Sequence, residues 1–395
     1  MSTKNEQTQG YLDFDEYLRQ GEPGKKEKAG IWQTAIGLQA VDGLQTSEYL
    51  KDTACRHIEG EIDIDEVREL IKNYYQSKSR REPDDDAKQE ADKVSANITK
   101  ILSSQALDFS AGGYISVHRR VFEDVFKHAG KLRDYNITKK EWVLNGDTVN
   151  YLNWEDLRRA LDYDIAQERE FSYKGISVDE MIRHITNFVS GLWQIHPFCE
   201  GNTRTTAVFT ILYLSSIGFN VSNDLFARHS WYFRNALARA NYKNARLGID
   251  YTTIYLERFF RNLLLGDKWD LRNRYLYVNV SEEWKVQPNL LHPTSTPQVD
   301  SSDPTSTPQA ENVLHIDNLN IMKLINAIND SELSLKEMLA AMGLKDRKSF
   351  LTLYLNPAIT AGYVSLLYPD SPRHPRQKYL LTVKGLAVYN ESKQR

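Results

Sequence analysis

The sequence predicts a mainly helical chain that carries one β-hairpin and ends in a small domain of helices and strands. Three observations lead to this prediction. Apolar residues repeat at helical spacing as far as about Gly266, Asn145-Gly146 lies between two β-prone runs, and PTSTPQ occurs twice shortly before the end. The 395 residues, 41% of them hydrophobic, suffice for more than one domain.

Composition excludes several classes of protein. A net charge of -3 gives no whole-chain field for nucleic acid or membrane. The start, MSTKNEQTQG, lacks the apolar core of a signal peptide, and the run AVFTILYLSSIGF is too short to span a bilayer. Two distant cysteines, Cys55 and Cys199, form no disulfide framework. We therefore expect a cytoplasmic protein with no membrane partner.

Residues 1–85 form the predicted N-terminal segment. Residues 1–30 are polar and rich in glycine and lysine, which indicates a loosely held arm. TSEYLKDTACRHI has helical spacing and stops at Gly60, and IDIDEVRELIKNYYQ carries acids in its first turn. These two runs predict helices, followed by the charged connector KSRREPDDDAKQE.

The next segment, 86–286, contains the predicted hairpin and a buried helix. In EWVLNGDTVNYL (141–152), Asn145-Gly146 suits the positive φ angles of a type I′ turn. SVDEMIRHITNFVSGLWQI begins with a capping box, Ser177 to Glu180, and continues with one apolar stripe.

The candidate site is the stretch HPFCEGNTRTTAVF, between the helix that ends near Ile195 and a second helix at roughly 202–217. Backbone N–H groups of Gly201, Asn202 and Thr203 are predicted to be free at a helix N-terminus, a geometry that binds phosphate. Arg204 adds a positive fork for further phosphate oxygens.

Two other residues of this stretch suggest catalysis. Glu200 is a hard oxygen ligand of the kind that Mg²⁺ uses beside substrate phosphates. His196 titrates near neutrality and is the candidate general base. A lone histidine near a helix end is more often structural, however, and Glu-Gly-Asn is usually a turn. The residues alone leave a phosphate site and an ordinary turn equally open.

The stretch resembles the Fic family motif, His-x-Phe-x-(Asp/Glu)-Gly-Asn-Gly-Arg-x-x-Arg. The matching residues are His196, Phe198, Glu200, Gly201, Asn202 and Arg204. The resemblance covers about Ser95 to Gly266 and implies a helical Fic fold in which the hairpin is a "flap". It also implies the activity of most Fic enzymes, transfer of AMP from ATP to a protein hydroxyl with release of pyrophosphate.

The resemblance assigns a role to each matching residue. His196 would deprotonate a Ser, Thr or Tyr hydroxyl, and Glu200 would hold Mg²⁺ on the α- and β-phosphates. Asn202 and the amides of Gly201–Thr203 would form an anion hole for the α-phosphate. Arg204 would hold the β-phosphate, and Phe198 would anchor the loop in the core.

The resemblance also implies contacts outside the motif. The flap would clamp a target segment by strand pairing, and adenosine would contact a later helix. The flap residues are Leu144, Asn145, Gly146 and Thr148, and the adenosine residues are Tyr232 and Asn235.

Two positions depart from the motif: Thr203 replaces glycine, and Ala207 replaces the arginine that grips the γ-phosphate in the family. Arg234 and Arg239 are candidate replacements, although ordinary surface charge explains them equally simply. The loss of this arginine leaves a different nucleotide donor open.

CRHIEGEI resembles the Fic inhibitory motif, (Ser/Thr)-x-x-x-Glu-(Gly/Asn), with Cys55 in place of Ser and Glu59 as the glutamate. The resemblance implies that Glu59 inhibits, by repelling a γ-phosphate or by pairing with Arg204. The alternative is a solvated glutamate at a helix end.

Residues 287–312 are rich in Pro, Ser and Thr and predict a linker. Residues 313–395 then suggest three helices and two strands, the layout of a winged helix, with 11 Lys/Arg against 7 Asp/Glu. Basic residues at the third helix and in the wing suit DNA, although such modules also dock proteins. These residues are Arg347, Lys348, Arg373, Arg376 and Lys378.

The sequence thus predicts an autoinhibited protein adenylyltransferase that uses ATP and Mg²⁺ and modifies a target protein or itself. The family often dimerises, so a homodimer is one state that the resemblance allows. The main rival is a catalytically weak nucleotide sensor that regulates DNA through the winged helix. A nucleophilic Cys199 is disfavoured because it occupies a variable motif position, and zinc because a four-ligand spacing is missing.

Overall fold

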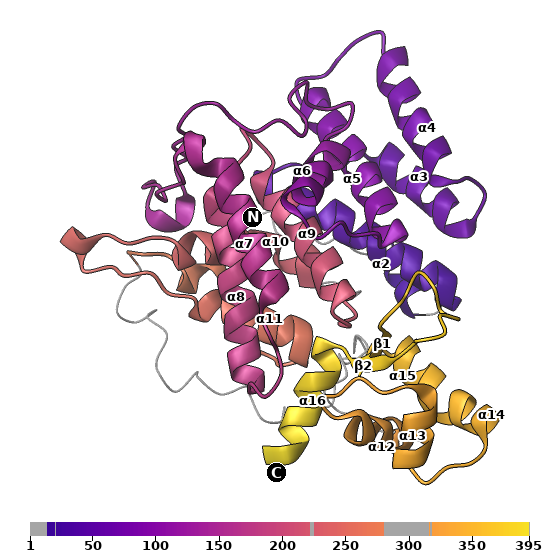
Figure 1. Cartoon of the computed structure of the whole chain (residues 1–395). Helices are drawn as coiled ribbons and strands as arrows, with labels where there is room; N and C mark the ends of the chain where they lie inside the picture. Colours follow the sequence, from indigo (N-terminus) through magenta and orange to yellow (C-terminus); the bar gives the residue numbers. More distant parts are fainter. Residues whose placement is uncertain (1–13, 20, 222–224, 280–315, 317, 395) are drawn as a thin grey trace, which may run out of the picture.

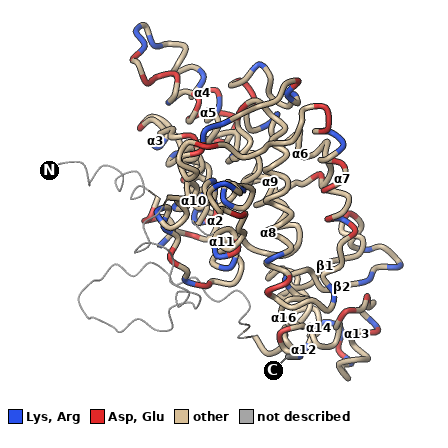
Figure 2. Tube along the Cα trace, turned by 90° about the vertical axis from the view of Figure 1, so that its left-hand side faces the viewer, with Lys and Arg blue, Asp and Glu red and all other residues tan. Residues whose placement is uncertain are grey.

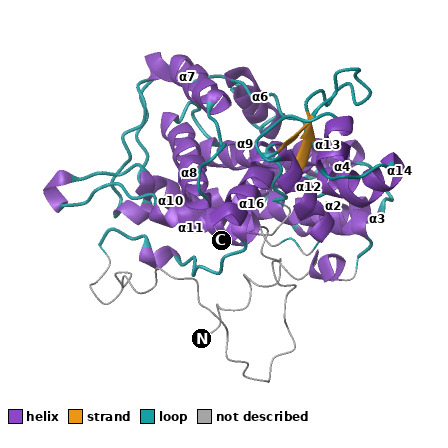
Figure 3. Cartoon of the chain, turned by 60° about the horizontal axis from the view of Figure 1, so that its bottom comes forward, coloured by secondary structure: helices purple, strands orange, loops and turns teal. Residues whose placement is uncertain are grey.

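The computed structural model describes residues 14–19, 21–221, 225–279, 316 and 318–394 (Figure 1). Helices make up most of this part of the chain, and two short strands form its sheet (Figure 3). The predicted fold class, mainly α with a small α+β part at the end, is confirmed.

The helical residues 14–19 and the helices α2 to α5 form the described part of the N-terminal segment. Their apolar faces enclose a core of their own, which includes the buried side chains of Phe14, Trp32, Leu50 and Ile71. The helices are α2 (Pro23–Gly37), α3 (Glu48–Glu59), α4 (Ile64–Ser77) and α5 (Asp85–Ser104), and the 3₁₀ turn η1 (Leu38–Asp42) follows α2.

The predicted helices α3 and α4 are confirmed, and so are their end signals. Gly60 ends α3 with φ 83°, and Asp63 and Glu66 form a capping box at the start of α4. The expectation of a loose arm over 1–30 is wrong for its described part. Residues 14–19 and 23–30 are helical, because Phe14 and Ala29 pack into the N-terminal core.

The central segment carries the helices that position the candidate site. Its long helices α8 and α9 run side by side (Figure 1) and are buried along most of their length. The capping box between Ser177 and Glu180 begins α8, as predicted. The helices are α6 (Ala111–Val121), α7 (Leu157–Glu170), α8 (Val178–Ile195), α9 (Asn202–Ser216), α10 (Leu225–Ala240) and α11 (Ile254–Leu265). The 3₁₀ turns η3 (Trp154–Asp156) and η4 (Ala245–Leu247) lie between them, and η5 (Asn273–Tyr275) follows α11.

The predicted β-hairpin at 141–152 is wrong in its strands and right in its turn. Asn145 (φ 56°) and Gly146 (φ 82°) both adopt the left-handed region that a type I′ turn requires. Residues Trp142–Leu144 instead form a 3₁₀ turn, η2. This turn places both Val143 and Leu144 in the core, without a paired strand. We use the name flap for residues 136–151, which surround this turn.

The C-terminal segment has the predicted order of three helical parts and a hairpin, with one helix more. The hairpin pairs Val364 with Leu381, and Figure 2 shows Lys and Arg residues along the loop between its strands. The elements are α12 (Leu319–Ile328), α13 (Leu335–Ala341), α14 (Arg347–Phe350), the π turn Leu351–Leu355, α15 (Asn356–Thr360), β1 (Val364–Leu366), β2 (Tyr379–Leu381) and α16 (Val383–Gln394).

The helix α16 corrects the predicted second strand, which was expected to run through TVKG. Thr382 ends the strand because its hydroxyl accepts a hydrogen bond from the amide of Gly385 (3.1 Å), and its carbonyl accepts from Leu386 (2.8 Å). These are the bonds of a helix start.

The C-terminal segment packs directly on the central helices. The amide of Asn390 in α16 donates to the carbonyl of Ile176, 2.8 Å away. Gly218, after α9, approaches Gly362 so closely that a Cβ on it would lie 2.2 Å from the Gly362 carbonyl oxygen. The expected linker, 287–312, lies outside the described residues, and the predicted domain boundaries remain predictions.

Candidate active site

The loop between α8 and α9 is shaped by two residues in the left-handed region. His196 ends α8 with φ 49°, and Gly201 precedes α9 with φ 74°. A Cβ at Gly201 would lie 2.2 Å from the ring of Phe122. Glycine is therefore required at 201 both by the backbone angle and by the approach of this ring.

The first turn of α9 presents unpaired backbone donors, as predicted. Among the described residues, no hydrogen bond uses the N–H groups of Gly201, Asn202, Thr203 or Arg204. Such a turn attracts anions, because its N–H groups and the helix dipole point the same way.

Asn202 holds the loop closed with its side chain. Its Oδ1 accepts from the amide of Phe198 (3.0 Å), and its Nδ2 donates to the carbonyl of Phe198 (2.7 Å). Both ends of the Asn202 carboxamide are thus occupied by the loop itself. Only its backbone N–H remains for the predicted anion hole.

Phe198 anchors the loop in the core, as the resemblance implied. It is fully buried and stacks on the ring of His118 with centroids 3.7 Å apart. Nε2 of His118 lies 3.1 Å from the Glu200 carbonyl, and its Nδ1 accepts from Gly130 (2.8 Å). Burial lowers the pKa of His118 to about 3, so this ring is a neutral support.

His196 has the properties of a base that is neutral at physiological pH. It is buried, and its Nδ1 lies 3.2 Å from the carbonyl of Trp193. A carbonyl only accepts, so this bond requires a proton on Nδ1 and leaves the lone pair on Nε2. Burial, followed by the positive charge of Lys139, holds the pKa of His196 well below its usual range.

Glu200 is exposed and forms an ion pair with Lys139 of the flap, with Oε2 and Nζ 3.0 Å apart. Within the described residues, no three His, Cys, Asp or Glu side chains gather into a metal site. One carboxylate nevertheless suits Mg²⁺, which takes one or two carboxylates together with substrate phosphates and waters. Glu200 therefore fits the ion, in competition with Lys139.

Arg204 is engaged by the N-terminal segment. Its guanidinium is buried over the ring of Phe122 and lies 2.8 Å from Asp42 of η1 and 2.7 Å from Glu90 of α5. Its Nη1 also donates to the side chain of Gln39 (3.0 Å). Nε of Arg204 and the Asp42 carboxylate form an ion pair, but they are not aligned as a hydrogen bond requires. As folded here, every nitrogen of Arg204 faces a side chain of this segment.

A second arginine continues the charged cluster toward the base. Arg234 of α10 pairs with Asp42 (3.0 Å) and with the buried carboxylate of Glu141 (3.2 Å). Glu141 accepts from the hydroxyl of Tyr151 (3.2 Å), whose ring lies 4.0 Å from that of His196. Arg234 thus supports the site rather than offering a free guanidinium for a γ-phosphate, which corrects that expectation.

Three further expectations are corrected by burial. Tyr232 and Asn235 are fully buried, and their side chains bond Tyr255 and Asn273, so neither reaches a nucleotide in this structure. Arg239 has buried Nε and Nη1 atoms without a partner among the described residues, and burial lowers its pKa. The hydrogen bonds of Tyr232 and Asn235 therefore lead to Tyr255 and Asn273 and not to the loop residues.

The predicted pairing of Glu59 with Arg204 is also wrong. Glu59 ends α3 and pairs with Lys25 of α2 at 2.6 Å, and its hydrogen bond raises the pKa of Tyr17 to about 12. It therefore faces the N-terminal helices. Acidic side chains do reach the motif arginine, but they come from η1 and α5.

The two departures from the motif have structural explanations. The Thr203 hydroxyl accepts from the indole N–H of Trp193 (2.9 Å), which ties α9 to the end of α8. Ala207 lies in α9, and its methyl group is fully buried in the core. An arginine at 207 would have to place its charge in that core.

The flap residues differ in their availability. Leu144 is buried, so its side chain is closed to a target. Asn145 is exposed and accepts from the hydroxyl of Tyr277 (2.7 Å), while the Thr148 hydroxyl accepts from the Lys139 amide (3.3 Å). Gly146 is exposed with open space around it.

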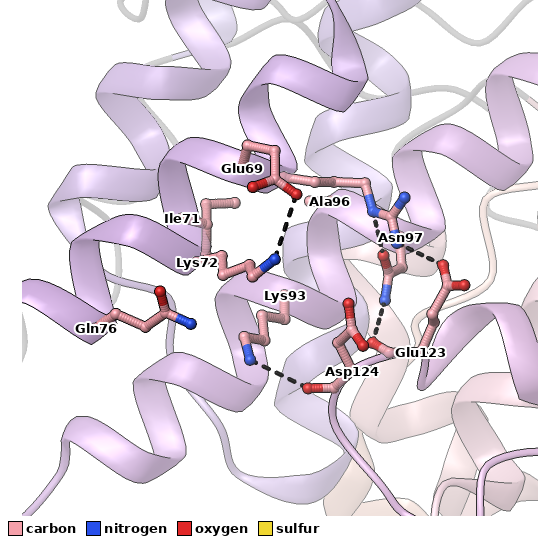
Figure 4. A pocket seen from close by; sticks show the side chains of 10 residues that line it. Glu69, Ile71, Lys72, Gln76, Lys93, Ala96, Asn97, Glu123 and Asp124 are labelled. Carbon is pink, nitrogen blue, oxygen red and sulfur yellow. Dashed lines mark hydrogen bonds and ion pairs between the residues drawn. The ribbon is translucent and has the colours of Figure 1, made fainter.

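A separate pocket lies among α4, α5 and residues 123–124, away from the loop (Figure 4). Its charged groups satisfy each other: Arg68 pairs with Glu123, Lys72 with Glu69 (3.6 Å), and Lys93 donates to the carbonyl of Asp124 (3.1 Å). These charged groups therefore pair with residues of the pocket's own wall. In the described chain no helix combines the length and the apolarity needed to cross a membrane.

Sequence reasoning missed Asp42, Glu90, Lys139, Tyr151 and Arg133. Asp42 and Glu90 could have been noticed, because each lies beside apolar residues, in AVDG and in QEAD. A carboxylate that such a segment carries into the interior needs a partner there. The other three lie in loops, where position in space does not follow from periodicity.

This helix–loop–helix site, with its histidine, carboxylate and free amides, defines a Fic-type domain, and comparison with known families agrees. The Fic/DOC family model matches residues 108–214, inside the range that the motif predicted. The model of the Fic-like protein's C-terminal domain (Filamentation induced by cAMP protein Fic-like) matches residues 320–382. The chain therefore carries a Fic domain followed by a Fic-like C-terminal domain.

Individual proteins also resemble the chain. Protein adenylyltransferase VbhT of Bartonella schoenbuchensis is 24% identical over 169 residues, which are 42% of this chain and 34% of VbhT. The chain thus spans about a third of the length of this curated relative. A crystal structure of a Fic family protein from Desulfovibrio desulfuricans covers 97% of both chains at 16% identity and a TM-score of 0.41, a likeness too weak to carry a conclusion.

Proposed function

We propose that the chain is a protein adenylyltransferase, which transfers AMP from ATP to a Ser, Thr or Tyr hydroxyl of a target protein or of itself. The observation that carries this proposal is a buried His196, with Nδ1 directed at the Trp193 carbonyl, beside unpaired amides at the start of α9. The Fic family match and the likeness to an adenylyltransferase support the same class of reaction.

In the proposed step, Nε2 of His196 accepts the proton of the target hydroxyl, and the hydroxyl oxygen attacks the α-phosphorus of ATP. A new oxygen–phosphorus bond forms, the bond to the β-phosphate oxygen breaks, and pyrophosphate leaves. The amides of Gly201–Thr203 stabilise the charge on the α-phosphate. Mg²⁺, held by Glu200 when bound, would supply charge neutralisation on the phosphates.

Arg204 can hold the β-phosphate only if Asp42 and Glu90 move away from its guanidinium. Its charge is already balanced by these two carboxylates, which would also repel a phosphate. Inhibition by Glu59 stays part of the proposal. It requires a movement of α3 that breaks the ion pair of Glu59 with Lys25.

The mass of the intact protein after incubation with Mg²⁺ and ATP tests this function. Wild type, Glu59→Gly and Glu59→Gly/His196→Ala should be compared. We expect a gain of one AMP that increases with Glu59→Gly and disappears with His196→Ala. Equal labelling of wild type and Glu59→Gly would show that Glu59 does not inhibit the transfer. No labelling at all, with ATP binding confirmed, would favour another donor or the sensor role.

A DNA partner for the C-terminal segment is a second proposal, supported by side-chain exposure. Arg347, Lys348, Arg373 and Arg376 are all exposed, and Lys378 makes only a 3.8 Å contact with Glu332. A gel-shift assay of the full chain should show binding that weakens in Arg373→Ala/Arg376→Ala and at high salt. Equal shifts for both proteins would exclude this surface and favour a docked protein, including a second copy of the chain.

A further inference from the structure

Arg133, in the segment between α6 and the flap, is buried and bonds to the catalytic loop. Its Nε donates to the carbonyl of His196 (2.8 Å), and its Nη2 reaches the carbonyl of Ile195 (3.4 Å). Its backbone N–H also donates to the carbonyl of Pro197 (2.9 Å). Three consecutive carbonyls around the candidate base are therefore held by one residue.

The same guanidinium bonds to both ends of the flap. Nη1 of Arg133 donates to the carbonyl of Tyr135 (2.6 Å), and Nη2 donates to the carbonyl of Leu152. Tyr135 precedes the flap and Leu152 follows it. In the described part of the chain no carboxylate pairs with Arg133, whose charge is met by these carbonyl dipoles.

His196 needs such support because its backbone lies in the left-handed region, with φ 49°. A residue with a Cβ rarely adopts this region unless its surroundings fix it. The ring has a separate support, Tyr151, which is held by Glu141 and Arg234. Arg133 acts on the backbone of His196, and its bond to the Leu152 carbonyl also holds the residue next to Tyr151.

We propose that Arg133 is a positioning residue, which fixes the backbone of His196 relative to the two ends of the flap. It follows, if the proposed function holds, that Arg133 sets the distance between the base and the hydroxyl presented along the flap. Lysine cannot replace it, because an ammonium is a compact point charge, whereas the planar fork reaches carbonyls on several sides.

The test compares Arg133→Lys with wild type by nitrogen NMR of ¹⁵N-histidine protein, in which the His196 signal is identified by its loss in His196→Ala. The charged and titratable groups around this ring are Lys139, Arg234, Arg133, Tyr151, Glu141, Cys199 and Glu200. Arg133→Lys keeps the positive charge, so any change reports geometry. The matched control is Arg258→Lys, another buried arginine, which lies over Trp269.

We expect wild type and Arg258→Lys to show His196 neutral and protonated on Nδ1 at pH 6, and Arg133→Lys to show a mixture of tautomers with a higher pKa. Transfer of AMP should fall about 100-fold in kcat with little change in the KM for ATP, since a displacement of about 1 Å has this effect. An unchanged His196 signal in folded Arg133→Lys would overturn the proposal.

Two outcomes separate this inference from the proposed function. If wild type transfers no AMP but its His196 signal responds to Arg133→Lys, the positioning role stands and the transferase fails. If Arg133→Lys does not fold, hydrogen exchange of wild type decides. The Nε–H of Arg133, which donates to His196, and its backbone N–H, which donates to Pro197, should both be protected and open together as one unit, and fast or separate exchange of the two would overturn the proposal.

Discussion

Oε1 of Glu90 lies 2.7 Å from Nη2 of Arg204, so a carboxylate of the N-terminal helices forms an ion pair with the arginine of the candidate motif. Arg204 is almost fully buried, and Glu90 keeps a quarter of its side chain exposed. A phosphate that binds Arg204 must therefore compete with a charge that the protein itself supplies. This competition connects the stability of the N-terminal segment to the binding of phosphate.

Glu90→Gln should change stability and binding in opposite directions. The free energy of unfolding should fall by about 2 kcal/mol, because the buried guanidinium of Arg204 loses the negative charge of Glu90 but keeps that of Asp42. The affinity for inorganic pyrophosphate with Mg²⁺ should rise. Urea unfolding and titration calorimetry measure the two effects.

The matched control is Glu61→Gln, which breaks the exposed pair with Arg56 and should change neither quantity. A loss of stability in Glu90→Gln without tighter pyrophosphate binding would mean that Arg204 is a structural residue. The β-phosphate would then need another partner.

Gly201→Ala should destabilise the loop. The added methyl group meets the ring of Phe122 at 2.2 Å, and the backbone has φ 74°. We expect a loss of about 2–4 kcal/mol from overpacking and the left-handed backbone together.

Gly112→Ala is the control for this change, because Gly112 lies in α6 with its nearest neighbour 3.5 Å away. It should be neutral or slightly stabilising, since alanine favours the helix by up to about 1 kcal/mol. The urea midpoints of both variants check the prediction, and equal midpoints would contradict it.

Acid should destabilise the protein through two buried histidines. The pKa values of His118 and His196 are lowered by burial, that of His118 to about 3, so the unfolded chain binds more protons below its ordinary pKa of about 6.5. Stability should thus be full above pH 6.5 and fall as the pH drops toward the folded-state values. The slope is about 1.4 kcal/mol per pH unit for each histidine.

Urea unfolding at pH 7, 6 and 5 measures this slope. His118→Gln should remove about half of the acid sensitivity that the two histidines cause. A variant with the wild-type slope would show that other groups control the acid transition.

Lys139→Met should lower the Mg²⁺ concentration needed for nucleotide binding. The pair with Glu200 is partly exposed, so its loss is worth at most about 1 kcal/mol, or roughly fivefold in affinity. Titration of Mg²⁺ in the presence of ATP measures the shift, with the exposed neighbour Lys140→Met as control. If Lys139→Met needs the same Mg²⁺ concentration as wild type, Glu200 does not bind the metal.

The local features of the fold were predictable from the sequence. The capping box at Ser177, the stop at Gly60 and the turn at Asn145-Gly146 each involve residues within a few positions of one another. Hydrophobic spacing and side-chain chemistry therefore suffice for them, and the motif residues His196 and Phe198 lie in the loop where the pattern indicated.

The partners of these residues could not be predicted in the same way. Glu90 is 114 residues from Arg204, and Arg133 is 63 residues from His196. Nothing in local periodicity selects one carboxylate or one arginine over another at such separations. The flap strands failed for a related reason, because burial of both Val143 and Leu144 overrode the β-propensity of the run.

The helix α9 ends close to where the two parts of the chain meet. Its N-terminus presents the unpaired amides of the candidate site, and Gly218, just beyond its C-terminus, touches the backbone of Gly362. Fifteen residues of α-helix form a rod of about 22 Å. A change at the contact of Gly218 with Gly362 would therefore act on the same helix whose other end forms the candidate site.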